Sequence, residues 1–313
     1  MAAAPESTRA ESTQAGSTPT HSTPTHSTPT HSTPTHSTPT DSTHAGSPDP
    51  TAPAQPRDLA HLHAARAHSF NAAAAQYAAH RPSYPEALFD AVEDLTGRPL
   101  TGARVADVGA GTGIATALLA RRGADVLAVE PGAGMAAELR RALPEVPLVR
   151  GDGNALPLAD ASVDLLTYAQ SWHWTDPARA VPEAWRVLRP GGALALWWNT
   201  SAVDVPWISD QSARIARHFG IEDAQVKKGS FDTGAADPTG SLRFAHRRVR
   251  WSRRVPVDTH LANIGSHSVF LVHGASSAQA FLTAERAHLL TVFPDGVVEE
   301  TYEVHLLLAR TTA

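Results

Sequence analysis

From Arg104 onward the chain alternates short apolar runs with helical patterns. The apolar runs cover Arg104–Val108, Asp125–Glu130, Val146–Arg150, Val163–Tyr168 and Ala193–Asn199. The stretches between them predict helices over Gly113–Arg122, Gly132–Leu143 and Asp176–Leu188. Strands that alternate with helices build βαβ units, whose strands run parallel in one sheet. We therefore expect an α/β fold.

The sequence on either side of this alternating part predicts additional elements. Residues 242–258 and 301–312 are predicted to form two long strands, with helical stretches between them near Ala278–Leu290. Two late strands that follow each other closely favour an antiparallel edge on the sheet. Residues 200–242 are less regular, and we interpret them as a lid or insertion. Residues 59–98 predict two N-terminal helices separated at Pro82 and Pro85.

Residues 1–58 contain no Leu, Ile, Val, Phe, Tyr or Trp. Such a segment cannot bury enough apolar surface to offset the entropy of ordering it. Within it the unit STPTH occurs four times in succession and is followed by STPTD. Its histidines could bind a metal, but a proline in every unit prevents a helix from aligning them. We interpret residues 1–58 as a disordered tail, expect no metal site, and assign residues 59–313 to the folded domain.

Composition excludes several classes of protein. The chain has no cysteine, so disulfides and thiolate metal sites are absent. Its net charge of −5 gives no reason to expect a nucleic-acid partner, and the basic stretch 243–254 is interpreted as the solvated face of an edge strand. No secretory leader and no apolar stretch of ~18 residues is visible. We expect a cytoplasmic protein with no membrane partner.

The first apolar run leads into a glycine-rich turn, DVGAGTG, which lets backbone approach a ligand closely. The turn carries Gly109, Gly111 and Gly113. A P-loop is excluded because no Gly-Lys-Ser/Thr follows, and a nicotinamide-binding turn would prefer glycine where Ile114 stands. An acid at Asp107 would repel a pyrophosphate. It suits a ligand that carries an ammonium group and a positive sulfur.

The stretch VADVGAGTG resembles the first motif of the class I S-adenosylmethionine-dependent methyltransferases. Three further stretches are similar to this family in the same order: VLAVEPGAGM, VRGDGNALPLADASVDLL and LRPGGALAL. The resemblance implies a Rossmann-like, doubly wound, seven-stranded and mostly parallel sheet with an antiparallel terminal strand. It also implies helices on both faces and S-adenosylmethionine as the cofactor.

The resemblance further implies which residues hold the cofactor. Glu130 would accept hydrogen bonds from the two ribose hydroxyls, Met135 would pack near the adenine, and Asp152 would meet the adenine amino group. Backbone at Gly153 and Asn154 would complete the adenine contacts. The expected cofactor residues are Asp107, Gly109, Ala110, Gly111, Thr112, Gly113, Glu130, Pro131, Met135, Asp152, Gly153, Asn154, Gln170, Ser171, Tyr77 and Arg81.

The segment SFNAAAAQYAAHRPSYPEAL resembles the N-terminal cover of a subgroup related to the ubiquinone/menaquinone-pathway and trans-aconitate-type methyltransferases. In that subgroup the segment closes over the cofactor. Arg81 or Tyr77 would then meet the cofactor carboxylate, and Tyr84 is a third candidate. Alternatively, these aromatic residues pack the helices onto the sheet.

The end of the fourth predicted strand, YAQSWHWTDP, points to the methyl acceptor. Ligands of open α/β sheets bind beyond the carboxyl ends of the strands, so Gln170 and Ser171 should lie near the methionine end of the cofactor. His173 is a candidate general base; alternatively it only hydrogen-bonds backbone. Transfer from a sulfonium can rely on positioning and desolvation, so no base is required.

Tryptophans at the end of the fifth predicted strand and in the predicted lid suggest the character of the acceptor. Trp197, Trp198 and Trp207 favour an aromatic pocket and a hydrophobic or planar small molecule. We therefore expect an S-adenosylmethionine-dependent methyltransferase that acts as a monomer or homodimer. A nicotinamide-dependent oxidoreductase would share the turn and Glu130, but the chain has no Tyr-x-x-x-Lys pair. A binding protein that keeps the cofactor but no longer transfers the methyl group stays open.

Overall fold

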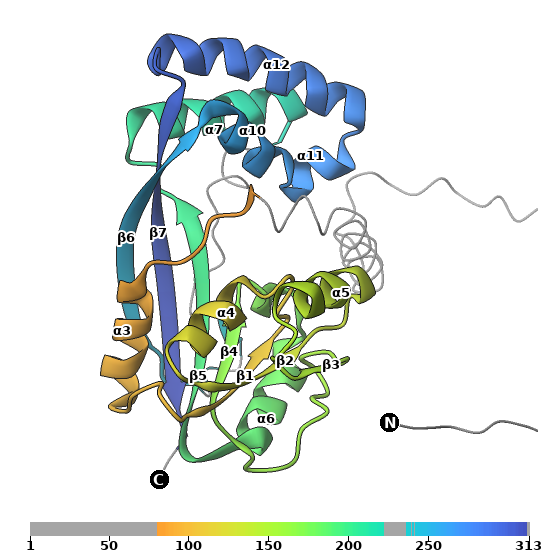
Figure 1. The fold of residues 1–313 in the computed structure, drawn as a ribbon, viewed down its shortest axis with the longest axis vertical. Coiled ribbons are helices and arrows are strands. Elements are labelled where there is room, and N and C mark those ends of the chain that lie inside the picture. Colours follow the sequence, from red (N-terminus) through yellow and green to blue (C-terminus); the bar gives the residue numbers. More distant parts are fainter. Residues whose placement is uncertain (1–79, 222–235, 239, 241, 312–313) are drawn as a thin grey trace, which may run out of the picture. The chain divides into compact units, whose positions relative to one another are not determined.

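The computed structural model describes residues 80–221, 236–238, 240 and 242–311 (Figure 1). The predicted tail, the first predicted helix and Tyr77 lie outside these residues, as does most of the second half of 200–242. Among the described residues, no helix is both long enough and apolar enough to cross a membrane.

Seven strands form one sheet in the order β3-β2-β1-β4-β5-β7-β6. Strands β1 to β5 pair in parallel, whereas β7 runs antiparallel to both of its neighbours. The predicted doubly wound sheet with an antiparallel terminal strand is confirmed. The strands are β1 Arg104–Val108, β2 Asp125–Val129, β3 Leu148–Val149, β4 Val163–Ala169, β5 Leu188–Ser201, β6 Ala245–Pro256 and β7 Val297–Arg310.

Local signals fix several helix ends. Asp176 caps the N-terminus of α6, where its side chain accepts a hydrogen bond from the Ala178 N–H. Gly97 ends α3 in the left-handed conformation, which glycine adopts without strain. The helices are α3 Glu86–Thr96, α4 Ile114–Arg121, α5 Ala133–Ala142, the 3-10 helix η1 Trp172–Trp174, α6 Pro177–Val187, α7 Pro206–Phe219, α10 Val257–Gly265, α11 Ser268–Val272 and α12 Ala275–Val292.

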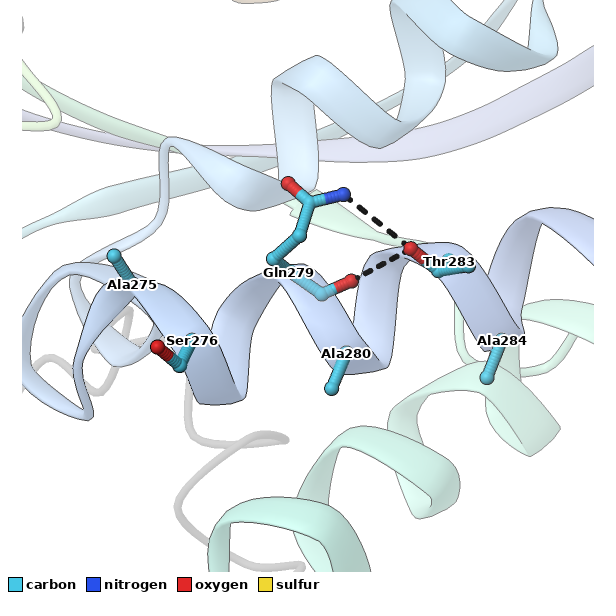
Figure 2. A pocket seen from close by; sticks show the side chains of 6 residues that line it. All are labelled: Ala275, Ser276, Gln279, Ala280, Thr283 and Ala284. Atoms are coloured by element: carbon cyan, nitrogen blue, oxygen red, sulfur yellow. Dashed lines mark hydrogen bonds between the residues drawn. The ribbon is translucent and has the colours of Figure 1, made fainter.

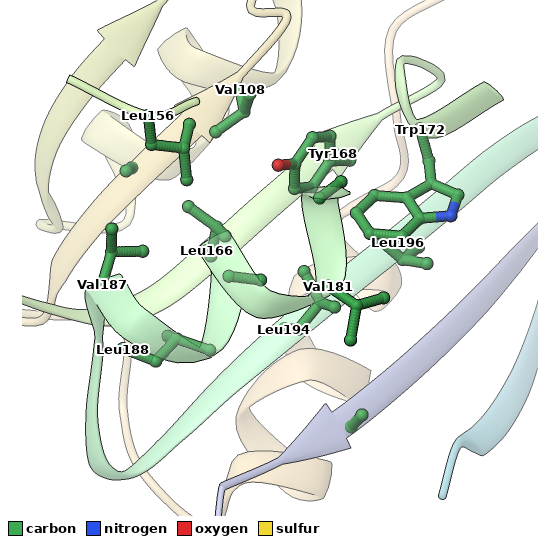
Figure 3. Close-up of a cluster of buried hydrophobic side chains, with 14 of the residues drawn as sticks. Val108, Leu156, Leu166, Tyr168, Trp172, Val181, Val187, Leu188, Leu194 and Leu196 are labelled. Atoms are coloured by element: carbon green, nitrogen blue, oxygen red, sulfur yellow. The ribbon is translucent and has the colours of Figure 1, made fainter. Parts of the chain in front are cut away.

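Both faces of the central strands are buried. Since successive strand residues point to opposite faces, they pack into two different apolar clusters. In β1, Ala106 and Val108 pack with the apolar residues of α6, whereas Val105 packs with those of α3 and α4. Figure 3 shows the α6 side, where the Tyr168 ring lies among leucines of β4 and β5. Strands covered on both faces read as the continuous apolar runs seen in the sequence.

The predicted aromatic acceptor pocket is wrong for two of its three tryptophans. Trp197 is fully buried in β5 and packs edge-on against Tyr84 and Phe89. Trp198 points to the opposite face and is buried in the α6-side cluster. Because β5 is covered on both faces, Trp197 and Trp198 belong to the core on opposite sides of the sheet.

Residues 200–221 are more regular than the sequence predicts. Strand β5 continues to Ser201, and α7 buries Ile208, Ile215 and Phe219 at helical spacing. Together with α10, α11 and α12, helix α7 surrounds a separate apolar cluster (Figure 1). Helices α10 and α11 are absent from the sequence prediction. The basic strand β6 lies at the sheet edge, as expected, with most of its arginines exposed or half-buried.

Candidate active site

The glycine turn between β1 and α4 adopts a backbone conformation that favours glycine. Gly109, Gly111 and Gly113 have φ angles of 65°, 60° and 89°. A Cβ on Gly109 would lie 2.5 Å from the Ser171 Cβ, and one on Gly113 would lie 2.9 Å from Leu143 Cδ1. The side chain of Ser171 is itself fixed, since its Oγ donates a 2.5 Å hydrogen bond to the Val108 carbonyl. The turn is therefore held tightly against the end of β4.

Asp107 lies in β1 beside Thr167 of β4 and is fully buried. Its Oδ1 accepts a hydrogen bond from Thr167 Oγ1 at 2.9 Å, and its Oδ2 accepts one from Thr116 Oγ1 at 2.6 Å. Burial raises the pKa of Asp107 to about 6, against the lowering effect of these hydrogen bonds. The carboxyl group thus joins β1 and β4 to the first turn of α4, directly before the glycine turn.

Glu130 follows β2 and closes the other side of the glycine turn. Its Oε2 accepts a hydrogen bond from the Gly111 N–H at 2.8 Å, and its Oε1 accepts one from the Gly132 N–H at 2.6 Å. Burial raises the pKa of Glu130, while these backbone hydrogen bonds lower it. The structure therefore places Glu130 against the glycine turn, while its predicted contact with the ribose hydroxyls stays a prediction.

The predicted adenine segment forms a tight turn after β3. Asp152 is exposed, and its Oδ1 accepts a hydrogen bond from the Asn154 N–H at 2.6 Å. Asn154 in turn accepts one from the Asp176 N–H at 2.7 Å, which fixes the segment to the start of α6. Gly153 lies against the Tyr168 ring, so that an added Cβ would come within 2.9 Å of it.

The remaining predicted residues of this region differ in exposure. Ala110, Thr112 and Met135 are buried, whereas Pro131 is exposed. The Thr112 Oγ1 atom is buried without a hydrogen-bond partner among the described residues. A buried hydroxyl without a partner is costly unless a ligand completes it, and this one lies within the glycine turn.

The residues after β4 occupy three different environments. Gln170 has a φ of 57°, which is rare for a residue with a side chain and is common at functional sites. Ser171 is buried against Gly109. His173 is exposed on η1, with its ring centroid 4.7 Å from that of Trp174. The predicted general base therefore lies near the predicted cofactor residues but at the surface.

A cavity lies at the carboxyl ends of β4 and β5, where Gln170 and Asn199 form part of its wall. It is partly open to solvent. Arg81 from the predicted N-terminal cover lines the same cavity and donates a 3.4 Å hydrogen bond to the Ser266 carbonyl. The structure thus brings together Arg81 and Gln170, while His173 does not line the cavity.

The opposite wall of the cavity comes from α7, α10 and β7 and was missed in the sequence. It is polar: His260 Nδ1 lies 2.7 Å from Glu300 Oε1, and the Asn263 amide donates to Glu300 and to the Tyr302 hydroxyl. Gln211 contacts the other ring nitrogen of His260. Trp207, the third predicted tryptophan, lines this wall and packs edge-on against His260.

The charge of Glu300 is balanced inside the protein. Arg253 Nε donates to its Oε2 at 2.5 Å, and the carboxyl is almost fully buried. Burial raises the pKa of Glu300, but the hydrogen bonds and charges of His260 and Arg253 outweigh it and lower the pKa to about 2. Burial and the charge of Arg81 lower the pKa of His267, which also lines the cavity, to about 3.

Two other features of the described residues offer no catalytic or metal-binding chemistry. A shallow hollow on α12 is lined by small residues and by Gln279 and Thr283, which hydrogen-bond each other (Figure 2). It offers no charged or nucleophilic group beyond a few hydroxyls. Within the described part of the chain, no group of three or more histidines and carboxylates could hold a metal ion.

Comparison with known proteins identifies the domain. Residues 106–196 match the model of a methyltransferase domain. A segment of 149 residues is 46% identical to an uncharacterized methyltransferase of Mycobacterium tuberculosis and covers 48% of this chain and 59% of that protein. Another, of 106 residues, is 42% identical to the demethylmenaquinone methyltransferase of Beutenbergia cavernae, covering 34% of this chain and 43% of that protein. The chain thus spans less than two thirds of the length of these curated relatives.

A solved structure agrees with the sequence relatives. A candidate type II methyltransferase from Anaeromyxobacter dehalogenans is 25% identical and superposes with a TM-score of 0.59. The superposition covers 74% of this chain and 99% of that one. The strand order, the glycine turn and these relatives agree. The chain therefore carries a methyltransferase domain of the class I, S-adenosylmethionine-dependent type.

Proposed function

We propose that this protein transfers a methyl group from S-adenosylmethionine to a small-molecule acceptor. The observation that carries the proposal is the glycine turn, which is fixed on one side by Ser171 and on the other by Glu130. Such a turn lets backbone approach a ligand at the carboxyl end of the sheet. We also propose that the protein belongs to the subgroup related to menaquinone-pathway methyltransferases.

The residues of the turn fit the cofactor. The buried Thr112 hydroxyl lacks a partner, and Glu130 carries a carboxylate at the end of β2, where the ribose would lie. Asp107 supplies negative charge at the start of the turn for a cationic ligand. Asp152, Gly153 and Asn154 would hold the adenine. Ala110, Pro131 and Met135 would complete the walls of the site.

Arg81 and Gln170 extend this site toward the cavity that they line. We assign the cofactor carboxylate to Arg81, because a guanidinium binds a carboxylate strongly in a partly buried site. Tyr77, the other candidate, lies outside the described residues. The cofactor would supply a methyl group on a positive sulfur. The chain would position the acceptor in line with that methyl group and exclude water.

The acceptor would be a small molecule that reaches the cavity beside Gln170 from its solvent-open side. Of the three predicted tryptophans, Trp207 is the one that lines this cavity, so the proposal of a planar or hydrophobic acceptor rests on this indole. His173 is the general base proposed from the sequence. The protein would act as a monomer or homodimer.

Isothermal titration with S-adenosylmethionine and with S-adenosylhomocysteine tests the proposal. We expect saturable binding of both ligands. A protein that binds neither is not a methyltransferase of this kind. NADH and NADPH are the comparison ligands, since a dinucleotide-binding protein would bind these instead. A variant of residues 57–313 should bind like the full chain if the first 56 residues have no part in the site.

A further inference from the structure

The cavity lined by Arg81, Gln170, Asn199, Trp207, Asn263 and His267 carries information about the acceptor itself. We propose that it takes an uncharged acceptor with a hydroxyl group, which Asn199 and Asn263 recognise by hydrogen bonds, and that this hydroxyl is the methylated group. This inference rests on the proposed methyl transfer and adds the substrate class and the residues that select it.

The charges around the cavity are already neutralised by the protein. Glu300 is balanced by Arg253 and His260, and behind this wall Glu285 is balanced by Arg214, whose Nη2 lies 2.7 Å from Glu285 Oε1. Among the described residues that line the cavity, Arg81 carries the only guanidinium or ammonium group. Once Arg81 binds the cofactor carboxylate, these described lining residues offer no further guanidinium or ammonium group to an anionic acceptor. A cationic acceptor likewise finds Glu300 occupied.

Two buried amide atoms in the wall lack a partner among the described residues. Asn199 Oδ1 accepts a 3.0 Å hydrogen bond from Trp251 Nε1, which leaves the Asn199 Nδ2 donor unpaired. Asn263 Nδ2 donates to Glu300 and Tyr302, which leaves the Asn263 Oδ1 acceptor unpaired.

The orientation of both amides is fixed by these partners. An indole N–H can only donate, and an ionised carboxylate can only accept. The wall thus presents one donor and one acceptor, and buried groups of this kind require partners. A hydroxyl group both accepts and donates, so it can pair with either atom without bringing a charge.

The neutral hydroxyl must lose its proton during transfer. A lone pair of the acceptor oxygen forms the new C–O bond to the methyl carbon, while the C–S bond breaks and its electron pair returns to sulfur, giving a neutral thioether. Once its oxygen is bonded to the methyl carbon, the hydroxyl becomes a stronger acid than an imidazolium whose pKa is about 3. Its proton therefore passes to His267, whose imidazole lines the same cavity and makes no hydrogen bond through its ring nitrogens within the described part of the chain. His267 then releases the proton to solvent.

A binding experiment with three single-ring probes tests the substrate class. Full-length protein is saturated with S-adenosylhomocysteine, which occupies Arg81 and prevents turnover. Saturation-transfer NMR then measures the binding of phenol, benzoate and benzylamine, which differ in head-group charge. We expect saturable binding of phenol and little binding of the two ions. Preferential binding of benzoate or benzylamine, or of none of the three at millimolar concentration, overturns the proposal.

Variants connect the binding of phenol to the amide. Asn199→Leu removes the unpaired donor and should weaken phenol binding about tenfold. Asn199→Asp keeps an oxygen for Trp251 and serves as a second variant if the leucine disturbs packing. Gln279→Leu removes an amide from the exposed face of α12 and should bind phenol like the wild type. Unchanged phenol binding in both Asn199 variants rejects the proposal.

The titration with S-adenosylhomocysteine distinguishes a wrong acceptor class from a wrong proposal of methyl transfer. If the protein and its variants bind S-adenosylhomocysteine but phenol fails, the acceptor class is wrong and methyl transfer stands. If S-adenosylhomocysteine itself does not bind, the proposed function fails first.

Discussion

The Ser171 side chain occupies the space that a side chain on Gly109 would need. A Cβ built on Gly109 lies 2.5 Å from Ser171 Cβ and 2.9 Å from Ser171 Oγ, and the φ of Gly109 is 65°. Gly109→Ala should therefore lower the free energy of unfolding by about 1–3 kcal/mol and weaken cofactor binding. Urea denaturation without cofactor measures the first effect.

Gly111→Ala is the matched control for this clash. Its φ of 60° is equally unusual, but the nearest atom to an added Cβ is 4.0 Å away. We expect it to cost only about 1 kcal/mol from backbone strain. A Ser171→Gly substitution should recover part of the stability of Gly109→Ala. Equal losses for both alanine variants, with no recovery, would contradict the proposed contact.

Ionisation of Asp107 should make the folded protein less stable as the pH rises. Burial raises the pKa of Asp107 from 3.8 to about 6, so the folded state holds this proton more tightly than the unfolded state. Its contribution to stability is complete below about pH 4 and is lost as the pH rises to about 6, a difference on the order of 3 kcal/mol. Asp107→Asn cannot ionise and should gain stability relative to wild type across this range.

Denaturation at pH values from about 4 to about 7 measures this difference. Comparing wild type with Asp107→Asn cancels the titration of all other groups. If the gap between the two proteins does not change with pH, Asp107 does not titrate in this range.

Glu300 should show the opposite dependence on pH. Despite its burial, His260 and Arg253 lower the pKa of Glu300 from 4.5 to about 2. The stabilisation is therefore complete above about pH 4.5 and lost as the pH falls toward 2, again on the order of 3 kcal/mol. Glu300→Gln should be less stable than wild type at neutral pH by about this amount, and the gap should close in acid.

Glu299→Gln, at the neighbouring exposed position, is the control for Glu300. It should change the free energy of unfolding by no more than about 0.5 kcal/mol. A gap for Glu300→Gln that persists in acid would mean that lost packing, and not lost charge, explains the destabilisation.

The parts of the molecule that the sequence predicts are those carried by local patterns. The apolar run of β1, the glycines after it and the Asp176 cap each act within a few residues, so the sheet core and the cofactor side follow from them. The pairing of His260 with Glu300 joins residues 40 positions apart and depends on how α10 packs beside β7. No sequence motif predicts the pairing of His260 with Glu300. For this reason the polar wall of the cavity is visible only in the structure.

Trp197 and Trp198 illustrate a second limit of prediction from the sequence. Two adjacent indoles at the end of a strand suggest a pocket if one face of the strand is open. Here helices cover one face with Phe89 and the other with Val181, so both indoles are core residues. The sequence does not show which faces of a strand are covered, because burial depends on elements that are distant in the chain.

Two histidines are candidates for receiving the acceptor proton, and their environments differ. His173 is exposed on η1, whereas His267 lines the cavity. With a hydroxyl acceptor, His267→Ala should reduce kcat about 10²-fold or more, with little change in the binding of S-adenosylmethionine. His173→Ala should then have little effect. The reverse result would assign the proton to His173, and a loss in neither variant would mean that no base is used.

Glu130 is the most direct test of the cofactor site. Both of its carboxylate oxygens already accept backbone hydrogen bonds from the glycine turn and from Gly132, and each retains a lone pair for a ribose hydroxyl. In Glu130→Gln an amide NH₂ faces one of these backbone N–H groups and leaves it unpaired. We expect a loss of about 1–3 kcal/mol in the binding of S-adenosylmethionine, and at least as much for Glu130→Ala. Titration calorimetry measures both, with Glu138→Gln on α5 as the control. If Glu130→Gln binds S-adenosylmethionine as tightly as the control does, the ribose lies elsewhere.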